Sequence, residues 1–252
     1  MKILTWNIEH GGSSRIDDIL QTLVNHNPDL IVLTEFRAVN EIQIRDRLKN
    51  AGWYFQLSSN PEAKTNGIFI ACKEPIELYE IEQNRLPNAQ HRWLNVLVPR
   101  LGLYILGVHI PGATDKWGKE DFWKAVVQYA GDRIDTQSII IGDFNTGLKI
   151  DSEGTPFALR KYMEKLANIG WIDAWRMKHP LERDFTWFSR VGNGFRLDYA
   201  FITPLLMDNL HVADHSHEER VKNYSDHSSL IIELLTENDQ ISTGESTHDG
   251  QV

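Results

Sequence analysis

The sequence predicts an α/β fold in which two packed β-sheets are flanked by helices. Apolar runs alternate with amphipathic stretches over most of the 252 residues, which predicts strands and helices in turn. Some predicted strands are separated by helices and others follow one another directly, a mixture that favours two packed sheets with helices outside. With 41% hydrophobic and 24% charged residues, the composition is that of a folded globular protein.

The first part of the chain is expected to alternate between strands and helices. A strand over 3–6 precedes a helix over 16–24, where apolar residues recur every three or four positions. Asn27-Pro28 ends this helix, because the residue before a proline is disfavoured in the helical conformation. The unbroken apolar run 30–33 is typical of a strand covered on both faces, and a helix over 41–50 follows it.

The remaining elements follow the same two patterns. Further strands are expected over 67–72, 76–81, 92–98, 103–109, 139–141, 196–202 and 229–235, with helices over 121–134 and 159–169. Residues 236–252 are polar and have no periodic pattern. We therefore expect a disordered tail there and one folded domain over 1–235.

Charge and cysteine content limit the classes of protein to consider. The formal net charge of −9 argues against a protein that holds nucleic acid by bulk positive charge. Four acidic residues lie after residue 235 without any Lys or Arg, which leaves −5 for the domain. The single cysteine, Cys72, lies in an apolar run and is expected to be buried. Without a disulfide, a secretory signal or an apolar stretch of about 18 residues, a cytoplasmic protein that does not bind membranes is expected.

Several predicted strands end in a carboxylate, an amide or an imidazole. These residues are Asn7, Glu35, His109, Asp143 with Asn145, Asp198, and Asp226 with His227. One such residue alone is usually a turn residue, a helix cap or a solvated charge. Six strand ends of this kind can converge on one cleft, and α/β proteins bind ligands at such edges. Asp198 lies within an apolar strand, where burying a carboxylate is costly unless a metal ion or a protonated histidine pairs with it.

The side chains of this set favour a hard divalent cation. Oxygen ligands predominate, and Mg²⁺ typically binds one or two protein carboxylates while keeping positions for water and phosphate. Mn²⁺ is an alternative that the sequence leaves open. Zinc is less favoured because no His-Glu-x-x-His motif or cysteine pair is present, and a serine hydrolase is less favoured because there is no Gly-x-Ser-x-Gly motif.

An ordered set of short motifs resembles the signatures of the endonuclease/exonuclease/phosphatase superfamily. The motifs are Trp6-Asn7, Thr34-Glu35, Gly142-Asp143-Phe144-Asn145, Arg196-Leu197-Asp198-Tyr199 and Ser225-Asp226-His227, which together cover about residues 1–235. The resemblance implies a four-layered α/β sandwich similar to deoxyribonuclease I, with two packed mixed β-sheets flanked by helices. It also implies metal-dependent hydrolysis of phosphate esters at one edge of that sandwich.

The resemblance implies a metal ligand and a catalytic base among these residues. Glu35 resembles the principal metal ligand, with Asn7 and Asp226 nearby. Asp143 resembles the residue that orients and deprotonates the attacking water. Asn145 resembles its partner, which places the water and a phosphate oxygen.

The same resemblance implies contacts with the phosphate. His227 resembles the imidazole that contacts it, held by Asp198 and kept cationic by that pairing. His109 would either protonate the leaving oxygen or grip the phosphate. Arg37, two residues after Glu35, stands where a lysine is common and is expected to bind substrate.

Aromatic residues near the fourth motif are similar to those of exonuclease III and the abasic-site endonucleases. In that branch, aromatic side chains wall a pocket for a flipped-out, base-free sugar. Trp187, Phe195 and Leu197 would form this wall, and Arg196 is expected to contact substrate; the alternative is that these aromatics are ordinary core residues. His109 departs from that branch and is more similar to deoxyribonuclease I or the sphingomyelinases.

The sequence leaves three functions to be separated. The first is a Mg²⁺-dependent DNA endonuclease or exonuclease, with abasic DNA as one candidate substrate. The second is a phosphatase or phosphodiesterase for a small molecule or lipid headgroup, which the negative net charge favours. The third, an inactive binding scaffold, is least favoured because no residue of the set is missing. A nuclease should show a positive strip beside the cleft, and the residues expected to form it are Arg92, Arg190, Arg196 and Lys222. We expect a monomer.

Overall fold

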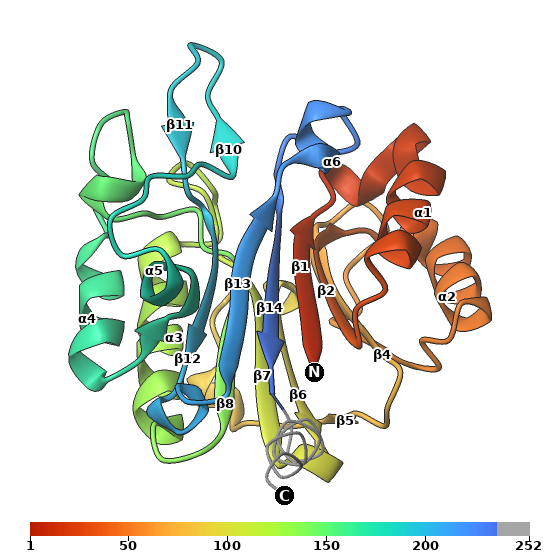
Figure 1. Ribbon diagram of the computed structural model, residues 1–252, viewed down its shortest axis with the longest axis horizontal. Coiled ribbons are helices and arrows are strands. Elements are labelled where there is room, and N and C mark those ends of the chain that lie inside the picture. Colours follow the sequence, from red (N-terminus) through yellow and green to blue (C-terminus); the bar gives the residue numbers. More distant parts are fainter. Residues whose placement is uncertain (236–252) are drawn as a thin grey trace, which may run out of the picture.

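The computed structural model describes residues 1–235 and contains two six-stranded β-sheets packed against each other. Helices cover the outer face of each sheet, which gives the molecule four layers (Figure 1). The four-layered α/β sandwich expected from the sequence is confirmed. The tail expected over 236–252 lies outside the described residues.

The first sheet has the strand order β13-β14-β1-β2-β4-β3. Its strands are β1 (Lys2–Asn7), β2 (Leu30–Phe36), β3 (Phe55–Ser58), β4 (Gly67–Cys72), β13 (Leu210–Ser216) and β14 (Ser229–Leu234). β1 and β2 run parallel, whereas the other neighbouring pairs are antiparallel. The carboxyl ends of β1 and β2 therefore lie at the same edge of the sheet.

The second sheet has the order β5-β6-β7-β8-β12-β9 and the same mixed character. Its strands are β5 (Glu77–Leu78), β6 (Trp93–Val98), β7 (Leu103–His109), β8 (Ser138–Asp143), β9 (Ile172–Asp173) and β12 (Asp198–Ile202). Here β7 and β8 are the parallel pair. A separate hairpin of β10 (Trp187–Phe188) and β11 (Gly194–Phe195) extends beyond the sheets at the top of Figure 1.

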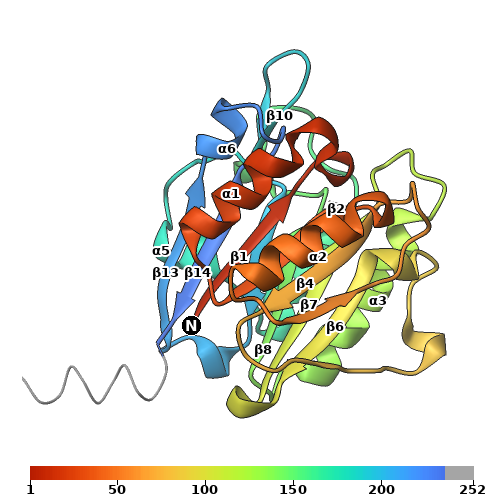
Figure 2. The same cartoon turned by 90° about the vertical axis from the view of Figure 1, so that its right-hand side faces the viewer.

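Two long helices cover each sheet. α1 (Ile16–His26) and α2 (Glu41–Asn50) lie over the first sheet, as Figure 2 shows. α3 (Lys119–Arg133) and α4 (Lys161–Ile169) lie over the second, and α5 (Ala174–Lys178) and α6 (Glu218–Val221) are short connecting helices. The apolar face predicted for α1 is buried, through Ile16, Ile19, Leu20 and Leu23.

The largest apolar core lies between the two sheets. It includes fully buried residues from the central strands of both sheets, among them Ile3, Val32, Ile70, Ile105 and Ile141. Helices cover the opposite faces of these strands, so the strands are buried on both sides and are apolar throughout. This packing holds the strand ends, and the polar side chains on them, in fixed positions.

The sequence-based boundaries are close for the long elements and wrong for several short ones. The strand expected over 76–81 shrinks to the two residues of β5. β3 and β13 were not expected, because both are edge strands whose partly exposed residues give no continuous apolar run. Cys72 is buried as expected, and burial raises the pKa of its thiol to about 11. No helix within residues 1–235 is long and apolar enough to cross a membrane.

Candidate active site

The sheet register aligns three of the predicted site residues on neighbouring strands of the second sheet. His109 at the end of β7 is the register partner of Asp143 at the end of β8. Asp143 is in turn the partner of Asp198, the first residue of the antiparallel strand β12. Partners on adjacent strands have Cα atoms about 5 Å apart. The three side chains therefore belong to one edge of this sheet.

The first sheet brings Asn7 and Glu35 to the same place. Asn7 ends β1, and Glu35 lies at an irregularity near the end of β2, with a left-handed φ of 56°. The Asn7 Nδ2 amide donates to Asp143 Oδ2 at 2.9 Å and lies 3.4 Å from Glu35 Oε1. One amide thus connects the predicted metal ligand of the first sheet to the predicted base of the second.

A tight turn after β8 fixes Asp143 and Asn145 relative to each other. The Asn145 backbone N–H donates to Asp143 Oδ1 at 2.8 Å, and its side-chain amide donates to the Ile110 carbonyl at 2.9 Å. Gly142, before the turn, has a φ of 138°, and a Cβ atom there would lie 2.1 Å from the Val108 carbonyl oxygen. Glycine is therefore required for β8 to pair closely with β7 at the site.

Asp143 is poised to accept a proton near neutral pH. Burial is the largest influence on its carboxyl and raises the pKa. The cationic His227 opposes this and the Asp198 carboxylate adds to it, which together leave the pKa of Asp143 at about 7. A general base is most effective when its pKa is close to the working pH.

His227 and Asp198 form a buried ion pair next to this base. His227 Nδ1 lies 2.9 Å from Asp198 Oδ2, and both side chains are buried. Burial alone would lower the pKa of His227, but the charge and hydrogen bond of Asp198 outweigh it and raise the pKa to about 10. The imidazole therefore carries a positive charge at neutral pH. The pairing that the resemblance implied is present.

His109 is buried beside the same carboxylates but has the opposite protonation. Its Nε2 lies 3.7 Å from Asp143 Oδ2 and 3.9 Å from Glu35 Oε1. Burial is the largest influence and lowers the pKa of His109 to about 4, despite the nearby Glu35. A neutral imidazole is a poor acid at neutral pH. This favours the alternative in which His109 grips the phosphate over the one in which it protonates the leaving oxygen.

Glu35 remains ionised in a crowded setting. Burial would raise its pKa, but the side-chain hydrogen bond with His10 and the nearby His109 hold the pKa of this carboxyl well below its usual range. Within residues 1–235 no three or more His, Cys, Asp or Glu side chains gather as a complete metal cage. An ionised carboxylate nevertheless fits Mg²⁺ or Mn²⁺, since such ions take few protein ligands and complete their shell with water. Asn7 would join it through Oδ1, which here accepts a hydrogen bond of 3.0 Å from the Glu9 backbone N–H.

Asp226 and Trp187 lie next to His227. Asp226 is exposed, and its Oδ2 accepts a hydrogen bond of 2.9 Å from Trp187 Nε1, so its place among the metal ligands remains a prediction. The Trp187 ring lies 5.8 Å from the Phe195 ring and 6.4 Å from His227. Phe157 packs edge-on against Phe195 at 5.6 Å. Trp187 and Phe195 are both partly exposed, so they are not core residues, whereas Leu197 is buried.

The structure contradicts the expected role of Arg196 in substrate binding. Its side chain is 0% exposed and pairs with Asp151 at 3.0 Å and with Asp173 at 2.6 Å. Its guanidinium also lies over the Tyr199 ring, 4.2 Å from the centroid. The buried ion pairs of Arg196 therefore stabilise the base of the hairpin formed by β10 and β11. Arg92, another member of the expected positive strip, is buried as well and pairs with an aspartate.

We expect Arg196→Met to destabilise the protein by about 3–5 kcal/mol, because it leaves Asp173 without its cation and Asp151 with Arg176 alone in a buried place. The measurement is the free energy of unfolding by urea, with Arg190→Met, an exposed position on the hairpin, as the control. Normal stability combined with weakened substrate binding would restore the role expected from the sequence.

Three residues near the site were not singled out from the sequence. His10 contacts Glu35, Lys119 donates to the backbone carbonyl of Asn145, and Phe157 joins the aromatic group. Burial lowers the pKa of Lys119 to about 8. Arg37, which was expected to bind substrate, donates to Asn66 Oδ1 at 2.7 Å and lies next to His10. None of the three lies in a motif with a recognisable spacing.

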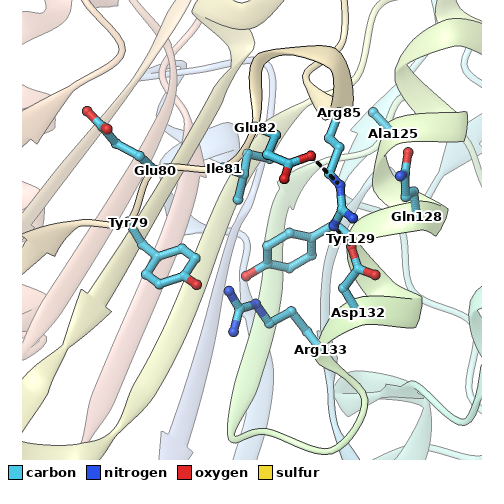
Figure 3. Close-up of a pocket in the computed structure, with 10 residues that line it drawn as sticks. All are labelled: Tyr79, Glu80, Ile81, Glu82, Arg85, Ala125, Gln128, Tyr129, Asp132 and Arg133. Carbon is cyan, nitrogen blue, oxygen red and sulfur yellow. Dashed lines mark hydrogen bonds and ion pairs between the residues drawn. The ribbon is translucent and has the colours of Figure 1, made fainter.

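A cavity of about 290 Å³ lies away from this site, between α3 and the segment after β5 (Figure 3). Its charged residues largely satisfy one another, since Arg85 pairs with both Glu82 and Asp132. Arg133 lies over the ring of Tyr104, near the start of β7, whereas the candidate site lies at the end of that strand. The cavity contains none of the residues predicted for catalysis.

The fold and the strand-end site define a protein of the nuclease and phosphoesterase class. The chain belongs to the Endonuclease/Exonuclease/phosphatase family, which it matches over residues 4–227. It is 24% identical over 245 residues to a DNA-(apurinic or apyrimidinic site) endonuclease from Dictyostelium discoideum, covering 84% of this chain. The chain spans 65% of the length of that relative.

Solved structures of similar proteins share the fold. A 3′ phosphatase, NExo, from Neisseria bound to a product DNA hairpin has a TM-score of 0.79 and 22% identity, covering 94% of this chain and 100% of that one. An AP endonuclease from Archaeoglobus fulgidus has a TM-score of 0.79 and 19% identity, with the same coverage.

Proposed function

We propose that the protein is a divalent-metal-dependent phosphodiesterase that cleaves DNA. The observation that carries the proposal is the meeting of Glu35, Asp143 and the cationic His227 at one edge of the two sheets, with Asn7 linking the first two. The names of the similar proteins, an AP endonuclease and a 3′ phosphatase bound to DNA, support DNA as the substrate.

Asp143 supplies the base in this mechanism. It takes a proton from a water molecule as the water oxygen forms a bond to phosphorus, and the bond from phosphorus to the departing sugar oxygen breaks. The backbone N–H of Asn145 holds one oxygen of Asp143 at 2.8 Å, which fixes the direction from which the proton is taken. The side-chain amide of Asn145 lies near the other oxygen and would turn to the phosphate.

The remaining groups stabilise the charge that develops on the phosphate. His227 presents a positive charge without a need for protonation during the reaction, because Asp198 keeps it cationic. Neutral His109 offers an N–H to a phosphate oxygen. Glu35 and Asn7, with Asp226 as the expected third ligand, would hold a divalent cation, which would supply Lewis-acid stabilisation of the developing charge.

The aromatic residues Trp187 and Phe195 suggest an abasic sugar as the recognised feature. Both belong to the hairpin that extends beyond the sheets (Figure 1), and Trp187 lies between Phe195 and His227, with ring distances of 5.8 Å and 6.4 Å. A flipped-out sugar without its base fits an apolar wall beside the phosphate site. Trp187 also donates a hydrogen bond to Asp226, so a sugar bound against these aromatic side chains would lie close to an expected metal ligand.

The test compares three substrates in Mg²⁺, in Mn²⁺ and in EDTA. They are a duplex with one abasic site, the same duplex without it, and bis(p-nitrophenyl) phosphate. We expect metal-dependent nicking at the abasic site. Trp187→Ala should slow it by about tenfold to a hundredfold, because the sugar loses an apolar contact and burying one apolar side chain is worth about 1.5–3 kcal/mol. Phe188→Ala is the control, since this neighbour on β10 points to the other face of the strand.

A phosphodiesterase for small molecules is the second candidate. It is favoured by the net charge of −9 and by the burial of Arg92 and Arg196, which removes half of the expected positive strip. Metal-dependent turnover of the small ester alone would favour this candidate and keep the mechanism. Inactivity on all three substrates would contradict both candidates and favour a scaffold.

A further inference from the structure

We propose that His10 is a nitrogen ligand of the Glu35 metal site, which makes the site favour transition ions such as Mn²⁺ over Mg²⁺. This inference rests on the proposed metal-dependent function and specifies the chemistry of its metal. His10 follows β1 by three residues and was not part of the set of strand-end residues.

A strained turn brings His10 onto Glu35. Glu9, His10 and Ser13 have left-handed φ values of 47°, 55° and 46°, and the two glycines between His10 and Ser13 are also left-handed. Such conformations are unfavourable for residues with a side chain and persist where the surrounding structure enforces them, often at functional sites. Asn40 enforces this one, because its amide donates to the Gly11 carbonyl at 2.6 Å.

The turn directs two His10 nitrogens at one carboxylate oxygen. The His10 backbone N–H donates to Glu35 Oε2 at 2.7 Å, and the imidazole Nδ1 lies 2.9 Å from the same oxygen. Glu35 itself has a left-handed φ of 56°. Two strained residues thus face each other. The His10 side chain is 59% exposed and the Glu35 side chain 16%, so the pair lies at the mouth of the site, where a hydrated ion can reach it.

The spacing of His10 Nδ1 and Glu35 Oε2 suits two ligands of one ion. Without a cation the two side chains share a hydrogen bond, and Arg37 Nη2 lies 3.0 Å from the same Nδ1 atom. A metal ligand must be deprotonated, so a cation bound here would replace the shared proton and use the lone pair of Nδ1. The two ligand atoms already lie 2.9 Å apart. Adjacent ligands of an octahedral ion with bonds of about 2.1 Å are separated by about 3 Å, which matches.

The presence of an imidazole changes which ion is preferred. Mg²⁺ binds oxygen ligands and water and gains little from a nitrogen, whereas ions of the first transition series bind imidazole well. A site with one carboxylate and one imidazole therefore gains affinity for Mn²⁺ relative to Mg²⁺. With a cation bound to His10 and Glu35, the positive charge of the adjacent Arg37 would interact with the substrate phosphate.

The experiment uses Mn²⁺ as the probe of the whole protein. Electron spin echo envelope modulation of bound Mn²⁺ detects a directly bonded nitrogen, and calorimetry gives the Mn²⁺ and Mg²⁺ affinities. In wild type we expect a nitrogen signal that His10→Ala removes. The Mn²⁺ affinity should fall by at least about tenfold, since even groups that only orient a ligand are worth tenfold to a hundredfold, while the Mg²⁺ affinity changes little. His211→Ala, at an exposed position of β13, is the control.

His109→Ala identifies the source of any nitrogen signal, because His109 is the other imidazole near Glu35. A signal that persists in His10→Ala, or Mn²⁺ binding without any nitrogen signal, overturns this inference and leaves the proposed function standing. Absence of metal binding together with metal-independent hydrolysis overturns both.

Discussion

Asp143→Asn should lower the rate of phosphodiester hydrolysis by about a hundredfold to ten-thousandfold, the range that a positioned general base contributes. The substitution keeps the shape of the side chain, and an amide can still accept the hydrogen bond from the Asn145 backbone. It removes the only function that the buried carboxylate has in the proposed step, the acceptance of a proton from water. The measurement is the single-turnover rate at saturating substrate and metal, with unfolding measured in parallel.

The control for this variant is Asp208→Asn, the same chemical change at an exposed turn before β13. Its rate should equal that of wild type. A rate for Asp143→Asn within about threefold of wild type would assign the base to another group, since even the low end of general-base catalysis is larger. The free energy of unfolding of Asp143→Asn must also be compared with that of wild type, because replacing a carboxylate near Asp198 and His227 alters a buried cluster.

The rate should also depend on pH through Asp143. Its pKa lies at about 7, raised by burial, and only the deprotonated form accepts a proton. The rate constant should therefore fall as the pH decreases below about 7 and level off above it. The measurement is the hydrolysis rate of wild type as a function of pH, and a bound cation would move the acidic limb of this profile to lower pH. A profile without any acidic limb would contradict the assignment of Asp143 as the base.

Most of the fold follows from patterns that are strong in this sequence. The continuous apolar runs of β2, β4 and β8 predict central strands, since such runs arise where both faces are covered. Edge strands such as β13 have one open face and alternate with polar residues, so their sequence resembles that of a loop. The two-residue strands are created by tertiary pairing and leave no periodic signal.

The site residues at strand ends can be predicted from the sequence, whereas those in loops cannot. Asn7, Asp143 and Asp198 follow or begin buried strands, and the register brings such ends together. His10 reaches the site through a left-handed turn, which depends on contacts with residues far along the chain. For Arg196 the sequence suggests a role that the structure does not support. Its place in a motif of the family predicts substrate binding, whereas the structure shows a buried side chain that pairs with two aspartates.

Glu35→Gln should weaken divalent-metal binding by at least about a hundredfold, or about 2.8 kcal/mol, because it replaces the ionised ligand by a neutral amide. Glu35 is a suitable ligand since its pKa is held well below the usual range, so that no proton competes with the metal near neutral pH. Glutamine fits the same space and can still accept the His10 backbone hydrogen bond. The fold should therefore be retained.

Calorimetric titration with Mg²⁺ and with Mn²⁺ measures this loss directly, and the hydrolysis rate at each metal concentration shows whether added metal restores activity. Glu77→Gln, on the exposed strand β5, is the matched control and should bind metal as wild type does. If Glu35→Gln binds metal normally, the cation lies elsewhere, and the strained contact between His10 and Glu35 needs another explanation. If binding is lost and the rate at saturating metal recovers, Glu35 serves only to hold the ion. A rate that stays low would mean that the carboxylate also orients Asn7 against Asp143.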